Sequence, residues 1–240
     1  MTITKVGRIS RASAARPQSY LPPLENGDQL TRAEFERRYE AMLDVNKAEL
    51  IEGAVHMPTP VSVSHAKPHA HIMSWLGTYC AATPGVEVYD NATVLLDADN
   101  EVQPDALLQL EPKAGGHSRV SAAGYLEGAP ELIVEIAATS AAIDLHAKMN
   151  VYRRTQVQEY LVWQTFEKRL DWFELRDERY AALAPDENGL LRSRVFPGLR
   201  LAVEALLEGN LGAVLGELQK GLSSKEHAKF AKHLAESVAH

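Results

Sequence analysis

The chain has a single cysteine, Cys80, among its 240 residues. One cysteine cannot form an internal disulfide or a thiolate metal cluster, which favours a reducing, cytoplasmic setting. No uncharged apolar run reaches the roughly 18 residues that a membrane span needs, and the N-terminal segment lacks the apolar core of a secretory signal. The sequence therefore predicts a soluble globular protein without a membrane segment.

An excess of basic residues is also absent. The 25 Lys and Arg residues against 32 Asp and Glu residues give a formal net charge of −7, which argues against a broad, nonspecific nucleic-acid binder but leaves a local basic groove open. The sequence contains no Walker loop, no GxGxxG and no GxSxG. Nucleotide hydrolysis by a phosphate-binding loop and serine acyl transfer therefore have no support from motifs.

Hydrophobic residues make up 45% of the chain, which is enough for a substantial core. Residues 1–28 carry basic, Ser, Ala and Pro residues without an apolar period, so we expect a flexible basic arm there. Residues 29–201 are expected to form the main domain, and residues 202–240 a helical C-terminal extension. The sequence leaves open whether the extension packs on the domain or mediates association.

Apolar periodicity and turn residues predict alternating helices and strands. Helices are expected over residues 31–43, 64–82, 141–155 and much of the C-terminal extension, with capping boxes at Thr31–Glu34 and Ser223–Glu226. Strands are expected over residues 49–57 with a turn near Gly53, 103–110, 131–137 and 159–165, with a hairpin over 86–96 turning at Asp90-Asn91 and a meander over 169–196. Residues 131–165 therefore read as a βαβ unit.

One charged residue stands in the most apolar of these strands. Glu135 lies within Leu132-Ile133-Val134-Glu135-Ile136-Ala137. A carboxylate in apolar surroundings loses a large hydration energy, so it must meet a cation, accept several hydrogen bonds or take up a proton. Glu135 therefore needs a partner.

A second acid begins the strand before it. Asp105 directly follows Pro104, and if the two strands are neighbours, Asp105 and Glu135 converge at their ends. Like charges at short range raise one pKa strongly unless a positive charge lies between them, and a divalent cation is the simplest such charge. Hard oxygen ligands without cysteine indicate Mg²⁺ or Mn²⁺.

The helix after Glu135 adds a second set of polar residues. Asp144, Lys148 and Tyr152 stand at i, i+4 and i+8, so they share one helical face that projects back over the strand. A lysine there can stabilise a phosphate or hold an attacking water, and Tyr152 can orient it. The alternative is an exposed Asp144–Lys148 pair beside a tyrosine that only packs.

Taken together, Pro104-Asp105 and Glu135, thirty residues later, resemble the core of the PD-(D/E)XK nuclease superfamily. Within it, the chain resembles the Uma-two (Uma2) family of putative restriction endonucleases from about Thr31 to about Leu234. The segments that carry the resemblance are ELIEGAVHMPTPVSVSH, QPDALL, PELIVEIAATSAAIDLHAKMNVYRRTQVQEYLVW, LDWFEL and SRVFPGLRL.

This resemblance implies an α/β fold, a restriction-endonuclease-like central mixed sheet flanked by helices, with an acidic metal site. Asp105 and Glu135 match the superfamily's metal ligands, and Glu49 of ELIEG matches the family's upstream glutamate, which is a further ligand or contacts a metal-bound water. Lys148 matches the family's helical lysine. The superfamily's usual lysine position, two residues after the strand acid, is Ala137 here, so catalysis depends on Lys148 reaching the site from the helix.

Several other residues have alternative interpretations. Glu52 replaces Glu49 as the ligand if the strand register differs, because a one-residue shift reverses the faces. His65, His69 and His71 suggest zinc only weakly, since no HExxH follows and Pro68 interrupts the pattern. His65 alone matches a family histidine and is a candidate for the cleft.

Among the remaining acids and aromatic residues, most are expected to be structural. Glu159 opens a strand as in the family, or simply pairs with Arg153 or Arg154. Glu131 is expected at the surface. The tryptophans are expected in the core rather than as base-stacking platforms; they are Trp75, Trp163 and Trp172.

The sequence thus predicts a metal-dependent endodeoxyribonuclease that uses Glu49, Asp105, Glu135 and Lys148. Phosphate contacts are expected from Lys67, Arg153, Arg154 and the N-terminal arm, and a homodimer is expected because cutting both strands requires two sites. The alternative is a catalytically inactive nuclease-fold module that binds nucleic acid or a protein partner. A third possibility is hydrolysis of another phosphodiester.

Overall fold

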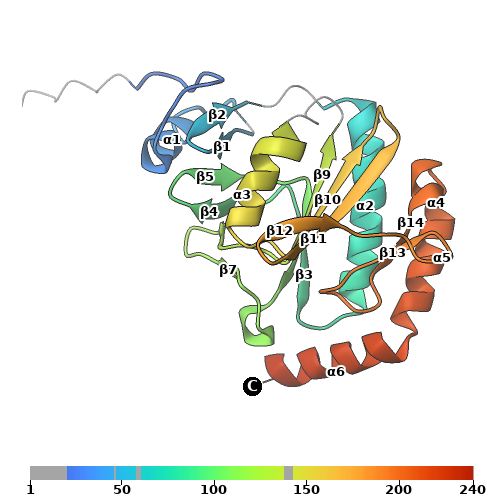
Figure 1. The fold of residues 1–240 in the computed structure, drawn as a ribbon. Coiled ribbons are helices and arrows are strands. Elements are labelled where there is room, and N and C mark those ends of the chain that lie inside the picture. Colours follow the sequence, from blue (N-terminus) through green and yellow to red (C-terminus); the bar gives the residue numbers. More distant parts are fainter. Residues whose placement is uncertain (1–20, 46, 58–60, 138–142, 240) are drawn as a thin grey trace, which may run out of the picture.

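The structure is a computed structural model that describes residues 21–45, 47–57, 61–137 and 143–239. At its centre lies a six-stranded mixed sheet with the strand order β12-β11-β10-β9-β6-β3 (Figure 1). Its strands are β3 (Val86–Asp90), β6 (Ala106–Leu110), β9 (Leu132–Ala137), β10 (Glu159–Gln164), β11 (Arg169–Arg176) and β12 (Arg179–Ala182). Only β9 and β10 are parallel, and every residue of both is buried. Burial on both faces explains why these two strands are so apolar.

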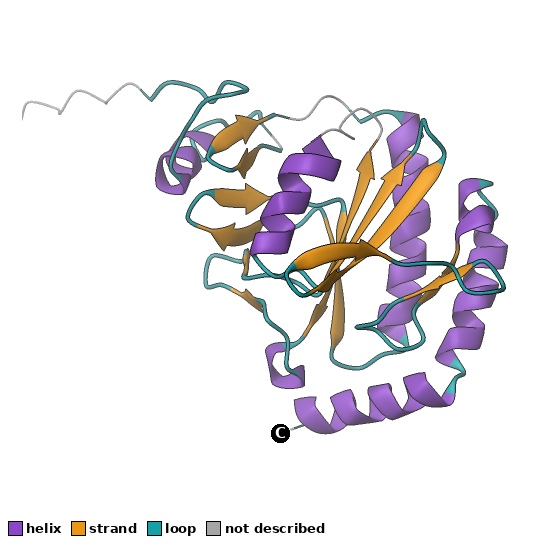
Figure 2. Cartoon of the chain, viewed as in Figure 1, coloured by secondary structure: helices purple, strands orange, loops and turns teal. Residues whose placement is uncertain are grey.

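Helices cover both faces of this central sheet (Figure 2). On one face lies α2 (Val63–Ala81), whose buried residues Ile72, Trp75, Leu76 and Tyr79 pack against alternate residues of β6, β9 and β10. On the other face lies α3 (Met149–Arg154), preceded by the π-helical segment η2 (Ile143–Lys148). The predicted βαβ unit is therefore present, as β9, η2 with α3, and β10. Residues 141 and 142 of the predicted helix lie outside the described residues.

A second six-stranded sheet, which the sequence did not predict, has the order β2-β1-β5-β4-β8-β7. Its strands are β1 (Glu49–Ile51), β2 (Ala54–His56), β4 (Val94–Asp97), β5 (Asn100–Val102), β7 (Arg119–Val120) and β8 (Leu126–Glu127). The turn expected near Gly53 is confirmed, since β1 and β2 form an antiparallel hairpin there.

The hairpin expected over residues 86–96 is wrong. Its two halves, β3 and β4, belong to different sheets: β3 pairs with β6, and β4 pairs with β5 and β8. Asn91, with φ 51, lies at the bend between them. Positive φ at Asn fits a hairpin turn as well as a bend between sheets, so the local signal is ambiguous.

The N-terminal region packs on the second sheet. Helix α1 (Arg32–Tyr39) begins after Thr31, whose side chain accepts a hydrogen bond from the Glu34 amide, as the capping box predicts. Residues 1–20 of the expected basic arm lie outside the described residues. The end of that arm is not detached, because Leu24 is buried and Gly27 donates from its amide to the Val55 carbonyl.

The C-terminal region continues the main core. A small sheet of β13 (Leu190–Arg192) and β14 (Arg200–Ala202) is followed by the helices α4 (Val203–Leu207), α5 (Leu211–Leu222) and α6 (Lys225–Val238). The 3₁₀ turn η1 (Pro112–Ala114) lies earlier in the chain, between β6 and β7. Val214, Leu218 and Leu234 join the core cluster on the α2 side, so the extension packs on the domain. The start of α6 is capped by Ser224, one residue later than predicted. The expected meander ends at β12, because β13 pairs only with β14.

Candidate functional site

Glu135 has the partners that its burial demands. Its side chain is only 3% exposed, and it lies on the face of β9 that α3 covers. The Lys148 ammonium donates to Glu135 Oε1 over 2.9 Å, and the Tyr152 hydroxyl donates to the same oxygen over 2.8 Å. Lys148 and Tyr152 therefore share one helical face above the strand, as their spacing predicts.

Lys148 also joins the two sheets. Its Nζ lies 3.0 Å from Oε1 of Glu49, the first residue of β1. Glu49 Oε1 additionally accepts a hydrogen bond of 2.8 Å from the Gln103 amide. All three charged side chains are buried, so one ammonium offsets two carboxylates in a low-dielectric setting. We call Glu49, Glu135, Lys148 and Tyr152 the lysine cluster.

Asp105 lies beside this cluster. The antiparallel register of β6 and β9 pairs Ala106 with Val134, and continuing it by one residue places Asp105 opposite Glu135. Asp105 Oδ2 accepts a 2.7 Å hydrogen bond from the Ile136 amide, directly after Glu135. The two acids therefore meet at the shared end of the two strands, as the sequence predicts.

Two basic side chains and one amide hold Asp105 ionised. His65 Nε2 from α2 lies 3.1 Å from Oδ2, and Lys47 Nζ lies 3.7 Å from Oδ1. Burial raises the pKa of Asp105, but the His65 hydrogen bond, the Lys47 charge and the Ile136 amide together lower this pKa to about 2. Asp105 is therefore a carboxylate at neutral pH, the form that a metal ligand requires.

The donor set fits a divalent cation that binds few protein ligands. Among the described residues, no three His, Cys, Asp or Glu side chains are arranged to hold a metal ion. Mg²⁺, however, commonly binds through one or two carboxylates and takes its other ligands from water and substrate phosphate. Asp105 and Glu135 are the candidate pair, although Glu135 contacts Lys148 as closely as Glu49 does.

The histidines do not form a zinc site within the described part of the chain. His65 binds the Asp105 carboxylate, and His69 Nε2 lies 2.9 Å from the Asp105 carbonyl oxygen and 3.1 Å from Asp90 Oδ1. His71 lines a separate cleft on the other side of α2. His65 thus reaches the site, as its resemblance to a family histidine suggests.

Two of the other candidate residues are engaged elsewhere. Arg154 pairs with Glu52 over 3.1 Å, and Arg153 donates to the Glu178 carbonyl over 3.2 Å. Both arginines are thus engaged by other parts of the protein at the far end of α3. Lys67 is exposed on α2, and the side chain of Asp144 lies outside the described residues.

The structure decides among the interpretations of three glutamates. Glu52 is exposed in the β1–β2 turn, so Glu49 and not Glu52 faces Lys148. Glu131, expected at the surface, is 1% exposed because its carboxylate accepts hydrogen bonds from the Leu110 and His117 amides. Glu159 pairs with neither Arg153 nor Arg154 and accepts instead from the Ser193 hydroxyl and the Arg194 amide.

Residues that the sequence did not single out surround the acids as well. They include Lys47, which approaches Asp105, and Gln103, whose amide binds Glu49. His56 of β2 lies opposite Glu49; burial lowers the pKa of His56, Glu49 raises it, and Lys148 lowers it further.

Comparison with known proteins connects this geometry to a family. The family model Uma2, described as "Putative restriction endonuclease", matches residues 32–204. A crystal structure of a putative nuclease belonging to DUF820 from Anabaena variabilis ATCC 29413 has the same fold, with a TM-score of 0.60 at 13% identity over 75% of this chain and 98% of that one. No curated protein matches the chain in sequence.

The family match covers the central sheet, α2, the lysine cluster and Asp105. The expected restriction-endonuclease-like fold is therefore confirmed, as is the resemblance to the Uma2 family. This chain is a member of the Uma2 family of putative restriction endonucleases.

Proposed function

We infer that the protein is a metal-dependent endodeoxyribonuclease, which hydrolyses phosphodiester bonds of DNA. The observation that carries this proposal is the meeting of Asp105 and Glu135 on paired strands, beside a lysine already bound to Glu135. The family supports a nuclease. Metal dependence and DNA as the substrate are our proposal.

Asp105 and Glu135 are the residues that would hold Mg²⁺ or Mn²⁺. When bound, such an ion polarises the scissile phosphate and lowers the pKa of a coordinated water. His65 and the Ile136 amide orient the Asp105 carboxylate, and the Tyr152 hydroxyl orients that of Glu135. In this proposal Glu49 holds Lys148 in place, although the resemblance also offers it as a ligand.

Lys148 supplies fixed positive charge at the site. Its ammonium is held by Glu49 and Glu135, so it reaches the site from the helix rather than from position 137, where this chain has alanine. Preorganised charge stabilises the phosphate oxygens as negative charge develops on them. Two sites are needed to cut both strands, so we propose a homodimer as the active form, acting in the cytoplasm.

Cleavage of supercoiled plasmid tests the proposal. Purified protein with Mg²⁺ or Mn²⁺ is expected to nick and linearise the plasmid, and Glu135→Gln is expected to abolish this activity. Glu52→Gln is the matched control, because Glu52 is exposed and pairs with Arg154. Absence of cleavage by the wild-type protein, or unchanged cleavage by Glu135→Gln, contradicts the proposal.

One observation favours the second candidate, an inactive module with a nuclease fold. Lys148 already offsets Glu49 and Glu135, and no group of three metal-binding side chains exists among the described residues. In that case the protein binds DNA or a protein partner without cleaving DNA. Wild-type protein that binds DNA but neither Mn²⁺ nor Mg²⁺ at millimolar concentration favours this candidate.

A further inference from the structure

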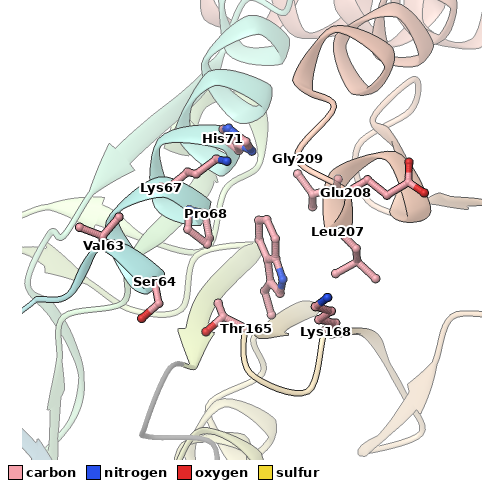
Figure 3. A pocket seen from close by; sticks show the side chains of 12 residues that line it. Val63, Ser64, Lys67, Pro68, His71, Thr165, Lys168, Leu207, Glu208 and Gly209 are labelled. Carbon is pink, nitrogen blue, oxygen red and sulfur yellow. The ribbon is translucent and has the colours of Figure 1, made fainter.

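A cleft lies on the other side of α2 from Asp105. It has a volume of about 470 Å³, within the usual range for small-molecule sites, and it is lined by the first turns of α2, the end of β10 with the following turn, and the α4–α5 junction. Figure 3 shows Lys67 and His71 on α2 opposite the segment Leu207–Gly209, with Thr165 and Lys168 across the opening. We call this the lateral cleft.

The lateral cleft carries positive charge that the rest of the protein does not offset. Lys67 and Lys168 are both exposed, and neither forms an ion pair within the described part of the chain. Glu208 is the one acid among the lining residues. The cleft is therefore net positive on a chain whose overall charge is −7. Such a local excess attracts an anion.

Two buried polar atoms in the lining lack partners. Neither His71 Nδ1 nor Thr165 Oγ1 has a hydrogen-bond partner among the described residues. Buried polar atoms are nearly always hydrogen-bonded, so an orphan pair in one cleft indicates a missing polar ligand. Both atoms are buried in this structure, so each reaches a phosphate oxygen only after its side chain rotates.

The remaining walls suit an aromatic ring. Pro68, Trp163 and Leu207 line the cleft and give it an apolar wall. Apolar and aromatic side chains beside cations suit a nucleobase, whose flat ring packs against them.

We propose that the lateral cleft is a nucleotide-binding site, with the phosphate between Lys67 and Lys168 and the base against the apolar wall of Pro68, Trp163 and Leu207. Its ligand is either a free nucleotide or one nucleotide of a bound strand. The second alternative, one nucleotide of a bound DNA strand, rests on the proposed function. Helix α2 presents His65 to Asp105 and Lys67 to the lateral cleft, so one DNA strand can contact both the acids and the cleft.

Binding measured without metal tests this site independently of catalysis. Calorimetry in EDTA uses thymidine 5′-monophosphate, inorganic phosphate, thymidine and a single-stranded oligothymidylate as separate probes. The monophosphate is expected to bind more tightly than phosphate or thymidine alone. Lys67→Ala/Lys168→Ala is expected to weaken binding about tenfold or more, and Leu207→Ala to weaken binding of the nucleotide but not of inorganic phosphate.

The matched control removes two lysines from α6, where Lys229 and Lys232 are exposed far along the chain. Lys229→Ala/Lys232→Ala is expected to leave nucleotide binding unchanged. If the oligothymidylate binds and Lys67→Ala/Lys168→Ala weakens its binding about tenfold or more, the ligand of the cleft is a DNA strand. If only the monophosphate binds, the ligand is a free nucleotide. Both outcomes support the site.

Two results overturn the proposal: no saturable binding of either nucleotide probe, or binding that survives Lys67→Ala/Lys168→Ala unchanged. These results are distinct from failure of the proposed function. If plasmid is cleaved and Glu135→Gln abolishes cleavage while the cleft variant binds normally, the nuclease stands and the cleft site falls. If plasmid is not cleaved but the monophosphate binds as described, the nucleotide site in the lateral cleft stands and the proposed nuclease function fails.

Discussion

Lys148 is a buried ammonium between two buried carboxylates, so its removal has a predictable cost. Lys148→Met removes the ammonium that Glu49 and Glu135 share, and we expect the free energy of unfolding to fall by about 3–5 kcal/mol. Adding Glu49→Gln removes one of these charges and is expected to recover part of that loss. Urea denaturation measures both changes.

Lys229→Met is the control for Lys148, because Lys229 is exposed on α6. A surface substitution of this kind changes stability by about 0.5 kcal/mol or less. If Lys148→Met costs no more than Lys229→Met, the lysine cluster does not stabilise the fold as the contacts imply.

Glu159 makes stability depend on pH. Burial raises the pKa of Glu159 to about 7, although the Arg194 amide, the Ser193 hydroxyl and the Val195 amide oppose the rise. A carboxyl whose folded-state pKa is raised stabilises the fold below the unfolded pKa of about 4.5, and this contribution is lost as the pH rises through 7. The full effect between these limits is about 3 kcal/mol.

Comparing wild type with Glu159→Gln isolates this contribution from other groups. The free energy of unfolding is expected to fall more steeply with pH in the wild type than in Glu159→Gln between pH 4.5 and about 7. The slope is the readout, because the amide changes the hydrogen bonds at every pH. Parallel pH profiles for the two proteins exclude a raised pKa at Glu159.

At the residue scale, the sequence predicted the acids but only part of what surrounds them. The apolar neighbours of Glu135 predicted a buried partner, and helical spacing supplied Lys148 and Tyr152. Lys47 and Gln103 were not predicted, because they approach from a second sheet. Contacts between distant segments leave no local pattern.

At the scale of elements, two of the three glycines of α5 have opposite surroundings. A Cβ on Gly221 would lie 2.0 Å from the Gly198 carbonyl oxygen, whereas a Cβ on Gly216 would meet nothing within 4 Å. Gly221→Ala must push α5 away from the loop that precedes β14, so we expect a loss of about 2 kcal/mol or more. Thermal denaturation followed by circular dichroism measures it.

Gly216→Ala is the matched control on the same helix. Alanine is a better helix former than glycine by about 1 kcal/mol, so this change is expected to stabilise the protein. Equal effects of the two substitutions would show that α5 does not approach the Gly198 loop as closely as described.

Which elements the sequence predicted depended on how local their signals are. Strands β9 and β10 and the helix between them were predicted, because each has a long apolar or periodic pattern. The second sheet was not, since its strands have two to four residues each and pair with distant partners. Asp90-Asn91 was interpreted as a hairpin turn although it leads from one sheet to the other.

At the scale of the whole molecule, the C-terminal helices belong to the main core. The family model ends at residue 204, yet Val214, Leu218 and Leu234 of α5 and α6 are buried with α2. Leu218→Ala is expected to cost about 2–5 kcal/mol, and a chain that ends at Gly209 is expected to lose cooperative thermal unfolding. A truncated chain that melts like the full one would contradict this arrangement.

The sequence left open whether residues 202–240 pack on the main domain or mediate association. The structure shows that they pack on it, since α5 contacts both α2 and β14. The sequence predicted that the extension is helical but not where it docks, because amphipathic periodicity identifies an apolar face and not its partner. The homodimer remains a prediction. Light scattering during size-exclusion chromatography measures it directly.

Calorimetric titration with Mn²⁺ tests the central claim most directly, because it asks whether Asp105 and Glu135 together bind a hard cation. Wild-type protein and Glu52→Gln are expected to bind Mn²⁺ at millimolar concentration or below, while Asp105→Asn and Glu135→Gln each abolish binding in proteins that remain folded by circular dichroism. Absence of Mn²⁺ binding by the wild type, or binding that survives both substitutions, would contradict the account.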